Sequence, residues 1–453
     1  MHSKKRFSLS TTQIILISFL LVILLGSALL SLPISSASGE RIPYIDALFT
    51  ATTSVCVTGL VTVTTATTWS TFGHVIILFL IQIGGLGVIT VLSGVMLLIH
   101  RRMSVGERLL LQDAFNLNSM ANLASFIRKV LGGTLAVELV GALLYMTVFI
   151  PEFGAKGVWI SFFTAVSAFC NAGIDIIGES SLYAYATHPL VNAVTCALIA
   201  LGGIGYIVWW DVFRVSKLAR AGNRHFLSHL TLHSKIAVSV TLLLILGGGA
   251  LFLAFEWSNP HTIGTLSVFD KIQVALFQSV TCRTAGFATV PQEELTSGSV
   301  AASLLLMFIG GSPVGTAGGV KTVTIAVLVC VASATIRGKK EKSLFGRRLP
   351  EEAVNKAVAV VVLFVAILLV STFLLALTTE APLEDVLFET VSATATVGLS
   401  RALTPSLNHL GKLIVIATMY LGRVGPISLA IAFGASREKQ NSVKEPTEQI
   451  SVG

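Results

Sequence analysis

Eight long apolar segments alternate along the chain with four shorter, semi-apolar pieces. A helix needs roughly 20 residues to cross a bilayer, and each long segment is long enough to do so. These segments lie near residues 13–32, 72–99, 130–150, 189–213, 236–255, 300–334, 356–378 and 409–433. The shorter pieces follow every other long segment, at 44–60, 158–174, 270–287 and 383–399. This pattern predicts an all-α membrane protein in which four re-entrant half-helices enter the membrane between pairs of spanning helices.

The four short pieces repeat one pattern at an even spacing. In each piece a phenylalanine stands nine or ten residues before a glycine, and an apolar residue follows that glycine. Self-similarity at a fixed period is the signature of internal repeats. The phenylalanines are Phe49, Phe163, Phe277 and Phe388; the glycines are Gly59, Gly173, Gly286 and Gly398, separated by 114, 113 and 112 residues.

A second mark recurs in phase with the first. The span after each of the first three pieces contains a pair of glycines, and the span after the fourth contains a glycine followed by arginine: Gly84–Gly85, Gly202–Gly203, Gly310–Gly311 and Gly422–Arg423. We therefore predict four M1–P–M2 repeats (helix, half-helix with its extended loop, helix) with pseudo-fourfold symmetry around a single ion pore. The repeats are placed at residues 1–102, 103–222, 223–340 and 341–436, followed by a cytoplasmic tail at 437–453. Their common orientation disfavours the inverted repeats of many carriers.

Composition agrees with a chain that lies mostly inside a membrane. Hydrophobic residues make up 53% of the chain and charged residues 12%, against about 25% charged residues in soluble domains. The formal net charge of +8 comes from basic residues in alternate loops, while the intervening connections are mostly acidic. This asymmetry predicts a multi-pass protein of the cell membrane with both termini cytoplasmic, and it explains the charge without a nucleic-acid partner. The five cysteines show no spacing typical of a zinc site or a disulfide framework.

Four extended loops that meet on one axis present rings of backbone carbonyls, and such rings replace the water shell of a monovalent cation. The half-helices would direct their partly negative C-terminal ends toward that axis. Asn171 and Arg283 are unexpected side chains for a symmetric ring, and the sequence leaves their orientation open. The predicted ion-binding residues are Cys56, Val57, Thr58, Gly59, Cys170, Asn171, Ala172, Gly173, Arg283, Thr284, Ala285, Gly286, Ala395, Thr396, Val397 and Gly398.

The sixth span contains a stretch, residues 310–322, whose glycines and proline cannot sustain a helix. Irregular backbone at this depth must be buried or line a cavity. We expect this stretch to obstruct the pore below the ring and to move as a gate. Its predicted gating residues are Gly310, Gly311, Ser312, Pro313, Gly315, Thr316, Gly318, Gly319 and Lys321.

Two intramembrane charges stand apart from the repeats. Arg423 replaces the second glycine of the mark in the last span, and a deep arginine usually faces a cavity or a partner. We expect Arg423 to hydrogen-bond the gating stretch and to set a barrier to cations; the alternative is a structural arginine bonded to helix carbonyls. For Glu138, in the third span, an interhelical hydrogen bond is favoured over a proton relay.

On these four loops and helix marks the chain resembles the Trk/Ktr/HKT superfamily of potassium transport subunits, over nearly its whole length. The resemblance implies that Gly59, Gly173, Gly286 and Gly398 are the glycines of a potassium selectivity filter. It also implies an intramembrane gating loop at residues 310–322 and a basic residue at position 423. The eight-span length is most like the bacterial Ktr type, which implies a homodimer and a separate cytosolic ring of nucleotide-binding regulatory subunits.

Several alternatives stay open on the sequence alone. A sodium-permeable or sodium-coupled transporter would share this architecture. A proton-coupled solute carrier is disfavoured by the parallel repeats and by the scarcity of intramembrane acids. An enzyme is disfavoured because no cluster of nucleophile, base or metal ligands is evident. We expect no cofactor in this chain beyond the transported potassium, with sodium as a candidate coupling ion.

Overall fold

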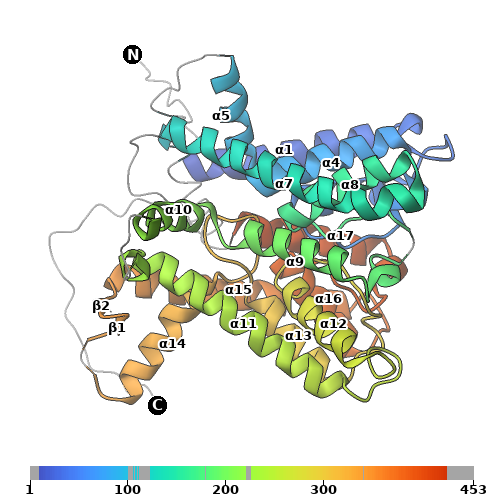
Figure 1. The fold of residues 1–453 in the computed structure, drawn as a ribbon. Coiled ribbons are helices and arrows are strands. Elements are labelled where there is room, and N and C mark those ends of the chain that lie inside the picture. The colour runs from blue at the N-terminus through green and yellow to red at the C-terminus, as the bar shows by residue number, and fades with distance from the viewer. Residues whose placement is uncertain are drawn as a thin grey trace.

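The structure is a computed structural model that describes residues 10–99, 106, 108–109, 111, 123–178, 180–220, 226–339 and 341–425. The predicted tail at 437–453 and the end of the last predicted span lie outside the described residues. Helices α1, α7, α11 and α15 are long, and most of the molecule is helical (Figure 1). α10 and the short hairpin β1–β2 lie toward the left of Figure 1, and α5 projects at the upper left.

Each repeat contributes one long helix, one short buried helix and a second helix. That second helix is divided in the first three repeats, and the fourth repeat is described only as far as residue 425. The first two repeats comprise α1 (Thr11–Leu30), α2 (Tyr44–Val55), α3 (Thr65–Thr68), α4 (Thr71–Leu86), α5 (Val88–Leu98), α7 (Leu123–Phe153), α8 (Lys156–Cys170), α9 (Pro189–Gly203) and α10 (Tyr206–Arg220). The last two comprise α11 (Leu232–Glu256), α12 (Val268–Thr281), α13 (Ser297–Phe308), α14 (Thr322–Ile336), the antiparallel strands β1 (Ser343–Leu344) and β2 (Arg347–Arg348), α15 (Glu351–Ala376), α16 (Leu383–Ala395) and α17 (His409–Val424). Short 3₁₀ helices lie at Pro33–Ser35, Tyr183–Tyr185, Phe226–His229 and Thr404–Ser406.

The long helices have apolar residues on their outer surface as well as on the side that packs against the rest of the protein. Among the described residues, the residues Thr12–Leu30, Leu123–Phe153, Leu232–Glu256 and Glu351–Ala376 are long and apolar enough to cross a membrane. Leu25 on α1 and Leu246 on α11 are more than half exposed. Because a water-soluble surface does not expose apolar rows of this extent, these sides face lipid.

The half-helices α2, α8, α12 and α16 occupy the interior. The phenylalanine that marks each repeat lies on one of them and is fully buried in every case. The repeated phenylalanine is therefore a packing residue, which seats each half-helix against the surrounding long helices. Eleven residues of α8, Phe163 among them, are buried, which is why this short piece is so apolar.

The predicted second and fourth spans are not continuous helices, and this corrects the sequence analysis. The chain bends by 97° between α4 and α5 and by 99° between α9 and α10. Gly87 and Gly205 stand at the two bends with φ of +86° and +92°, a backbone conformation that favours glycine. Gly425 ends α17 with φ of +89°. A break that the sequence analysis expected only in the sixth span therefore also occurs in the second and fourth spans.

Candidate functional site

Within three residues of its end, each half-helix is followed by a residue whose backbone is left-handed. Val57, Asn171, Thr284 and Thr396 stand two positions before the loop glycines and have φ of +47°, +58°, +68° and +52°. Non-glycine residues adopt this region at a cost of about 1–3 kcal/mol and do so mainly at functional sites. The backbone of all four loops is therefore held in one unusual shape that the fold has to stabilise.

A hydroxyl near the end of each half-helix supplies part of that stabilisation. Thr53 Oγ1 accepts a hydrogen bond of 2.9 Å from the Gly59 amide, and Ser392 Oγ accepts one of 3.0 Å from the Gly398 amide. Ser167 bonds both the amide and the carbonyl of Ile174, and Thr281 donates to the carbonyl of Phe287. Sequence reasoning missed this function. The signal was present, because a serine or threonine precedes the loop glycine by six residues in three repeats and by five in the third.

The four loop glycines form a closed ring. A methyl group on Gly59 would lie 2.6 Å from the carbonyl oxygen of Ala172, which precedes Gly173. The same relation runs from Gly173 to Ala285 at 2.5 Å and from Gly286 to Val397 at 2.6 Å. A methyl group on Gly398 would overlap the carbonyl of Thr58 and so closes the circle back to the first repeat. Four backbone carbonyls and four glycines therefore surround one axis, with no room for a side chain.

The glycines of the second helices let these helices approach the half-helix ends. A methyl group on Gly84 would overlap the carbonyl of Val55, and one on Gly202 would overlap that of Phe169. Gly422 stands in the same way against Thr394. In the third repeat the corresponding glycine, Gly310, meets Gly318 of residues 309–321 instead. The glycines that recur in the second helices therefore allow a close contact with the half-helix ends, and this contact positions the ring.

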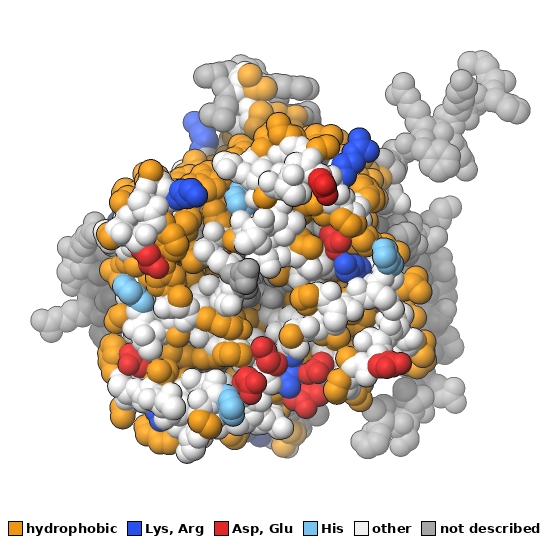
Figure 2. Space-filling view, turned by 90° about the vertical axis from the view of Figure 1, so that its right-hand side faces the viewer, with side chains coloured by type: hydrophobic (Ala, Val, Ile, Leu, Met, Phe, Trp, Pro, Cys, Tyr) orange, Lys and Arg blue, Asp and Glu red, His pale blue; other side chains and the backbone are white. Residues whose placement is uncertain are grey.

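A vestibule opens on one side of the ring. It is a cavity of about 270 Å³ whose lining includes all four loop glycines, Asp175 and Glu293. Figure 2 shows the corresponding face of the molecule, with Asp and Glu side chains spread around a central hollow. Burial raises the pKa of the Asp175 carboxyl to about 6. The hydrogen bond that this carboxyl accepts from the Ile177 amide lowers its pKa, but by less than burial raises it.

On the other side of the ring lies the interrupted sixth span. α13 ends at Phe308 and α14 begins at Thr322, so the expected break is present. Residues 309–321 between them, here called the intramembrane loop, close on themselves through hydrogen bonds from the Gly310 amide to Val320 and from the Thr322 amide to Gly311. The Gly318 amide donates to Thr284 Oγ1 at 3.2 Å, which places the loop directly against the ring.

The intramembrane loop is also anchored to the second repeat. The Ser312 amide donates to the carbonyl of Gly203 at 2.8 Å, and the Thr316 amide donates to that of Gly202 at 3.1 Å. In return the Tyr206 amide donates to Val314 at 3.0 Å. These carbonyls are free to accept because α9 ends at Gly203, and the last carbonyls of a helix lack partners within it. The bend at Gly205 therefore creates the attachment point of the loop.

Three basic side chains, of which Arg283 is buried and the other two are partly buried, hold the loop from different directions. Arg423 donates to the carbonyl of Thr316 and to that of Gly84, both at 2.5 Å. Lys321 Nζ donates to the carbonyl of Ala317 at 2.6 Å. Arg283 donates to the carbonyl of Gly310 at 3.1 Å and is 7% exposed. The predicted hydrogen bond between Arg423 and the loop is present, and a second bond joins Arg423 to the first repeat.

A second cavity, of about 240 Å³, lies on the loop's far side and is lined by Lys321, Arg423, Gly87 and Ala317 among others. The ring and the intramembrane loop therefore lie between two cavities. The vestibule has acidic walls and this second cavity has two basic side chains. A cation entering from the vestibule would meet carbonyl oxygens first and positive charge afterwards.

The structure answers the open question about Asn171 and Arg283. The Asn171 amide lies against Gly203 of α9, and Arg283 reaches to the loop and toward Thr241 of α11 at 3.5 Å. Both side chains point away from the ring, so only their backbones belong to it. Their identities differ between repeats because each contacts a different neighbour.

Glu138 of α7 is buried at 1% exposure and accepts a hydrogen bond of 3.2 Å from Gln82 of α4. Cys170 Sγ lies 3.6 Å from Oε1 of Gln82 and 3.9 Å from Oε1 of Glu138. The favoured interpretation, an interhelical hydrogen bond, agrees with these contacts. The cluster joins the first two repeats behind the ring.

This arrangement of four half-helices around one ring defines a membrane transport protein for cations. The chain belongs to the TrkH family of cation transport proteins, whose model matches residues 1–445. It is 39% identical to the potassium/sodium uptake protein NtpJ of Enterococcus hirae, over 100% of this chain and 99% of that protein. It is 36% identical to the Ktr system potassium uptake protein B of Bacillus subtilis, over 97% and 96% of the two chains.

A solved structure has the same fold. The crystal structure of the potassium transporter TrkH from Vibrio parahaemolyticus matches 95% of this chain and 86% of its own, with a TM-score of 0.73 and 17% sequence identity. The four-repeat pore architecture predicted from the sequence is therefore confirmed at the level of the fold.

Proposed function

We propose that this chain conducts potassium ions across the cell membrane, through a filter made by the four loops that end at Gly59, Gly173, Gly286 and Gly398. The observation that carries this proposal is the closed ring in which each loop glycine faces the carbonyl of the next repeat. Rings of backbone carbonyls substitute for the hydration shell of a monovalent cation. The names of two relatives, a potassium/sodium and a potassium uptake protein, agree with this substrate.

The second candidate is a transporter that also admits or requires sodium, and the name of the relative from Enterococcus hirae favours it. The two candidates make different predictions for rubidium uptake. We expect the protein in proteoliposomes to take up labelled rubidium, with potassium competing far better than sodium or lithium. Measurement of uptake against each competitor, with and without sodium outside, separates the candidates. Competition by sodium equal to that by potassium would contradict the potassium filter.

We infer that residues 309–321 are the gate of this pathway. The loop contacts the ring through Thr284 and is held by Arg283 and Arg423. The proposed repeat boundaries are those of the sequence analysis.

The proposed orientation puts the acidic vestibule outside and both termini in the cytoplasm. The end of the molecule with α5, α10 and the hairpin carries Arg214, Lys217, Arg347 and Arg348 (Figure 1), and basic loops remain on the cytoplasmic side. A homodimer and a cytosolic nucleotide-binding ring are part of the same proposal. The names of two relatives, potassium uptake proteins B and D of a Ktr system, support an assembly with other components.

Acidification outside should weaken uptake through Asp175. With its pKa raised to about 6, this carboxyl is mostly charged at pH 7.5 and mostly neutral at pH 5. One unit charge near an ion in water contributes about 1 kcal/mol, or about fivefold in occupancy. We therefore expect the KM for rubidium to rise by up to about fivefold between these pH values in the native chain.

The control for this prediction is a matched pair of variants. Asp175→Asn should raise the KM at pH 7.5 and lose the further rise at pH 5. Glu293→Gln removes a charge from the same cavity but keeps Asp175, so the rise should persist. A rise that survives in Asp175→Asn would show that another group is responsible.

A further inference from the structure

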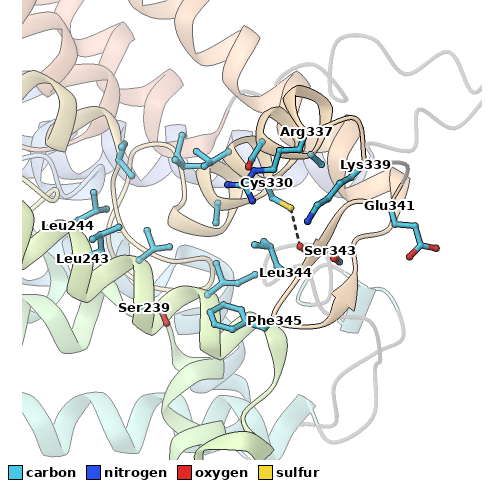
Figure 3. A pocket seen from close by; sticks show the side chains of 18 residues that line it. Ser239, Leu243, Leu244, Cys330, Arg337, Lys339, Glu341, Ser343, Leu344 and Phe345 are labelled. Carbon is cyan, nitrogen blue, oxygen red and sulfur yellow. Dashed lines mark hydrogen bonds between the residues drawn. The ribbon is translucent and has the colours of Figure 1, made fainter.

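A separate cavity of about 500 Å³ lies outside the ion pathway, between α11, α14 and the hairpin β1–β2 (Figure 3). Its volume falls within the range of small-molecule binding sites, which is about 300–1,000 Å³. The cavity extends from Ile309, the first residue of the intramembrane loop, to Phe345 at the tip of the hairpin. It thus spans from the depth of the loop to one end of the molecule.

The inner part of this cavity is apolar. Leu243 and Leu244 of α11 form one wall, and Ile325 and Val329 of α14 form the other. Cys330 Sγ lies 3.5 Å from the carbonyl of Ser343, a contact that holds the hairpin against α14. Hydrocarbon is the chemistry that fills such a space, because a polar group there would lose its water without gaining a partner.

The outer part of the cavity is cationic. Arg337 and Lys339 line it, and Figure 3 shows both side chains directed to the cavity while Glu341 points away. No ion pair among the described residues includes Arg337 or Lys339. Two cations without a carboxylate partner at the mouth of an apolar cavity match an amphiphile whose head is an anion.

We propose that this cavity binds an anionic phospholipid, with an acyl chain between α11 and α14 and the phosphate at Arg337 and Lys339. A soluble anion would leave the apolar walls unfilled, and a neutral lipid would leave both cations unpaired. Basic pockets between membrane helices on the cytoplasmic side are suited to acidic lipid head groups. The bound lipid would pack on α14, the helix that directly follows the intramembrane loop.

Lipid binding by the purified full-length chain tests this proposal without any measurement of transport, so its outcome is independent of the proposed filter. Native mass spectrometry would follow titration with phosphatidylglycerol or phosphatidylcholine. We expect the native chain to prefer phosphatidylglycerol. Arg337→Gln combined with Lys339→Gln should weaken that binding by about 10-fold or more, since each charge-assisted hydrogen bond is worth about this factor.

Two further variants separate a built site from general surface charge. Arg347→Gln combined with Arg348→Gln removes the same charge from β2, whose residues do not line the cavity, and should change binding less than about twofold. Val329→Trp fills the cavity, and because Val329 is 63% exposed, the larger side chain has room. It should weaken binding about as much as the loss of Arg337 and Lys339.

Three results would overturn the proposal. Equal losses in the two charge pairs would reduce the site to diffuse attraction, and unchanged binding in Val329→Trp would exclude the cavity as the seat of the acyl chain. Stronger phosphatidylglycerol binding after deletion of residues 437–453 would show that the chain's own tail occupies the cavity. Monodisperse elution of each variant confirms that it is folded.

Discussion

Gly173→Ala is expected to lower rubidium uptake by about 5–150-fold. The added methyl group would lie 2.5 Å from the carbonyl oxygen of Ala285 and 2.6 Å from the Cα of Gly286. Both are backbone atoms of the neighbouring loop, which cannot move aside as a flexible side chain would. Overpacking of this kind costs about 1–3 kcal/mol, and a barrier raised by that amount slows passage by the stated factor.

Strain at the substituted residue has to be separated from obstruction of the ring. Gly154 offers a matched control because its φ of +60° is close to the +63° of Gly173, while nothing lies within 4 Å of its Cβ position. Gly154→Ala carries the same backbone penalty without the overpacking, so its thermal stability should fall by that penalty alone, with uptake retained. Equal uptake in both variants would contradict the ring as the conducting element.

The architecture could be predicted from the sequence because each repeat needs particular residues at the same backbone positions. A glycine that must face a neighbouring carbonyl, such as Gly59 or Gly398, tolerates no substitution without a shift of backbone. Four such positions in phase reveal a ring. The fully buried phenylalanine of each repeat is conspicuous for a similar reason, since each half-helix has the same packed environment.

The bends at Gly87 and Gly205 were missed, although the signal was available. A glycine follows the first glycine of the helix mark by three residues in the first, second and fourth repeats, and Pro313 takes that place in the third. Hydropathy cannot reveal the bend, because α4 and α5 are both apolar and read as one span. The backbone conformation at one residue sets the direction of the chain there, and hydrophobic composition carries no information about that conformation.

Side-chain direction was beyond sequence reasoning. Arg283 stands in the loop pattern, yet its guanidinium leaves the ring for the carbonyl of Gly310. That partner is 27 residues away and comes close only because the intramembrane loop folds back under the third half-helix. Contacts that depend on how repeats are placed around an axis are not encoded in any one of them.

The intramembrane loop connects all four repeats. It begins and ends in the third, accepts support from Gly202 and Gly203 of the second, and receives Arg423 from the fourth. Arg423 bonds the first repeat as well, through Gly84 in the last turn of α4. Displacement of the loop therefore requires that bonds to several repeats break together, which suits a gate with two discrete positions.

Arg423→Ala is expected to raise rubidium uptake by the chain without other subunits by about 10-fold or more. The substitution removes both hydrogen bonds of the guanidinium, at about 1.5–3 kcal/mol for each bond to a charged group, and the positive charge that borders the second cavity. Both losses favour ion passage, because the loop is held less firmly and the cation meets less repulsion. Flux through proteoliposomes measures the effect directly.

Arg423→Lys distinguishes the two causes. Lysine keeps the charge, but a single ammonium on a flexible stem is poorly suited to bridge the carbonyls of Thr316 and Gly84, which the planar guanidinium joins. If the bridge holds the gate, uptake in Arg423→Lys should approach that in Arg423→Ala. If repulsion is the barrier, it should stay near the native rate. Unchanged rate and affinity in Arg423→Ala would exclude both causes and leave Arg423 as a structural arginine at the end of α17.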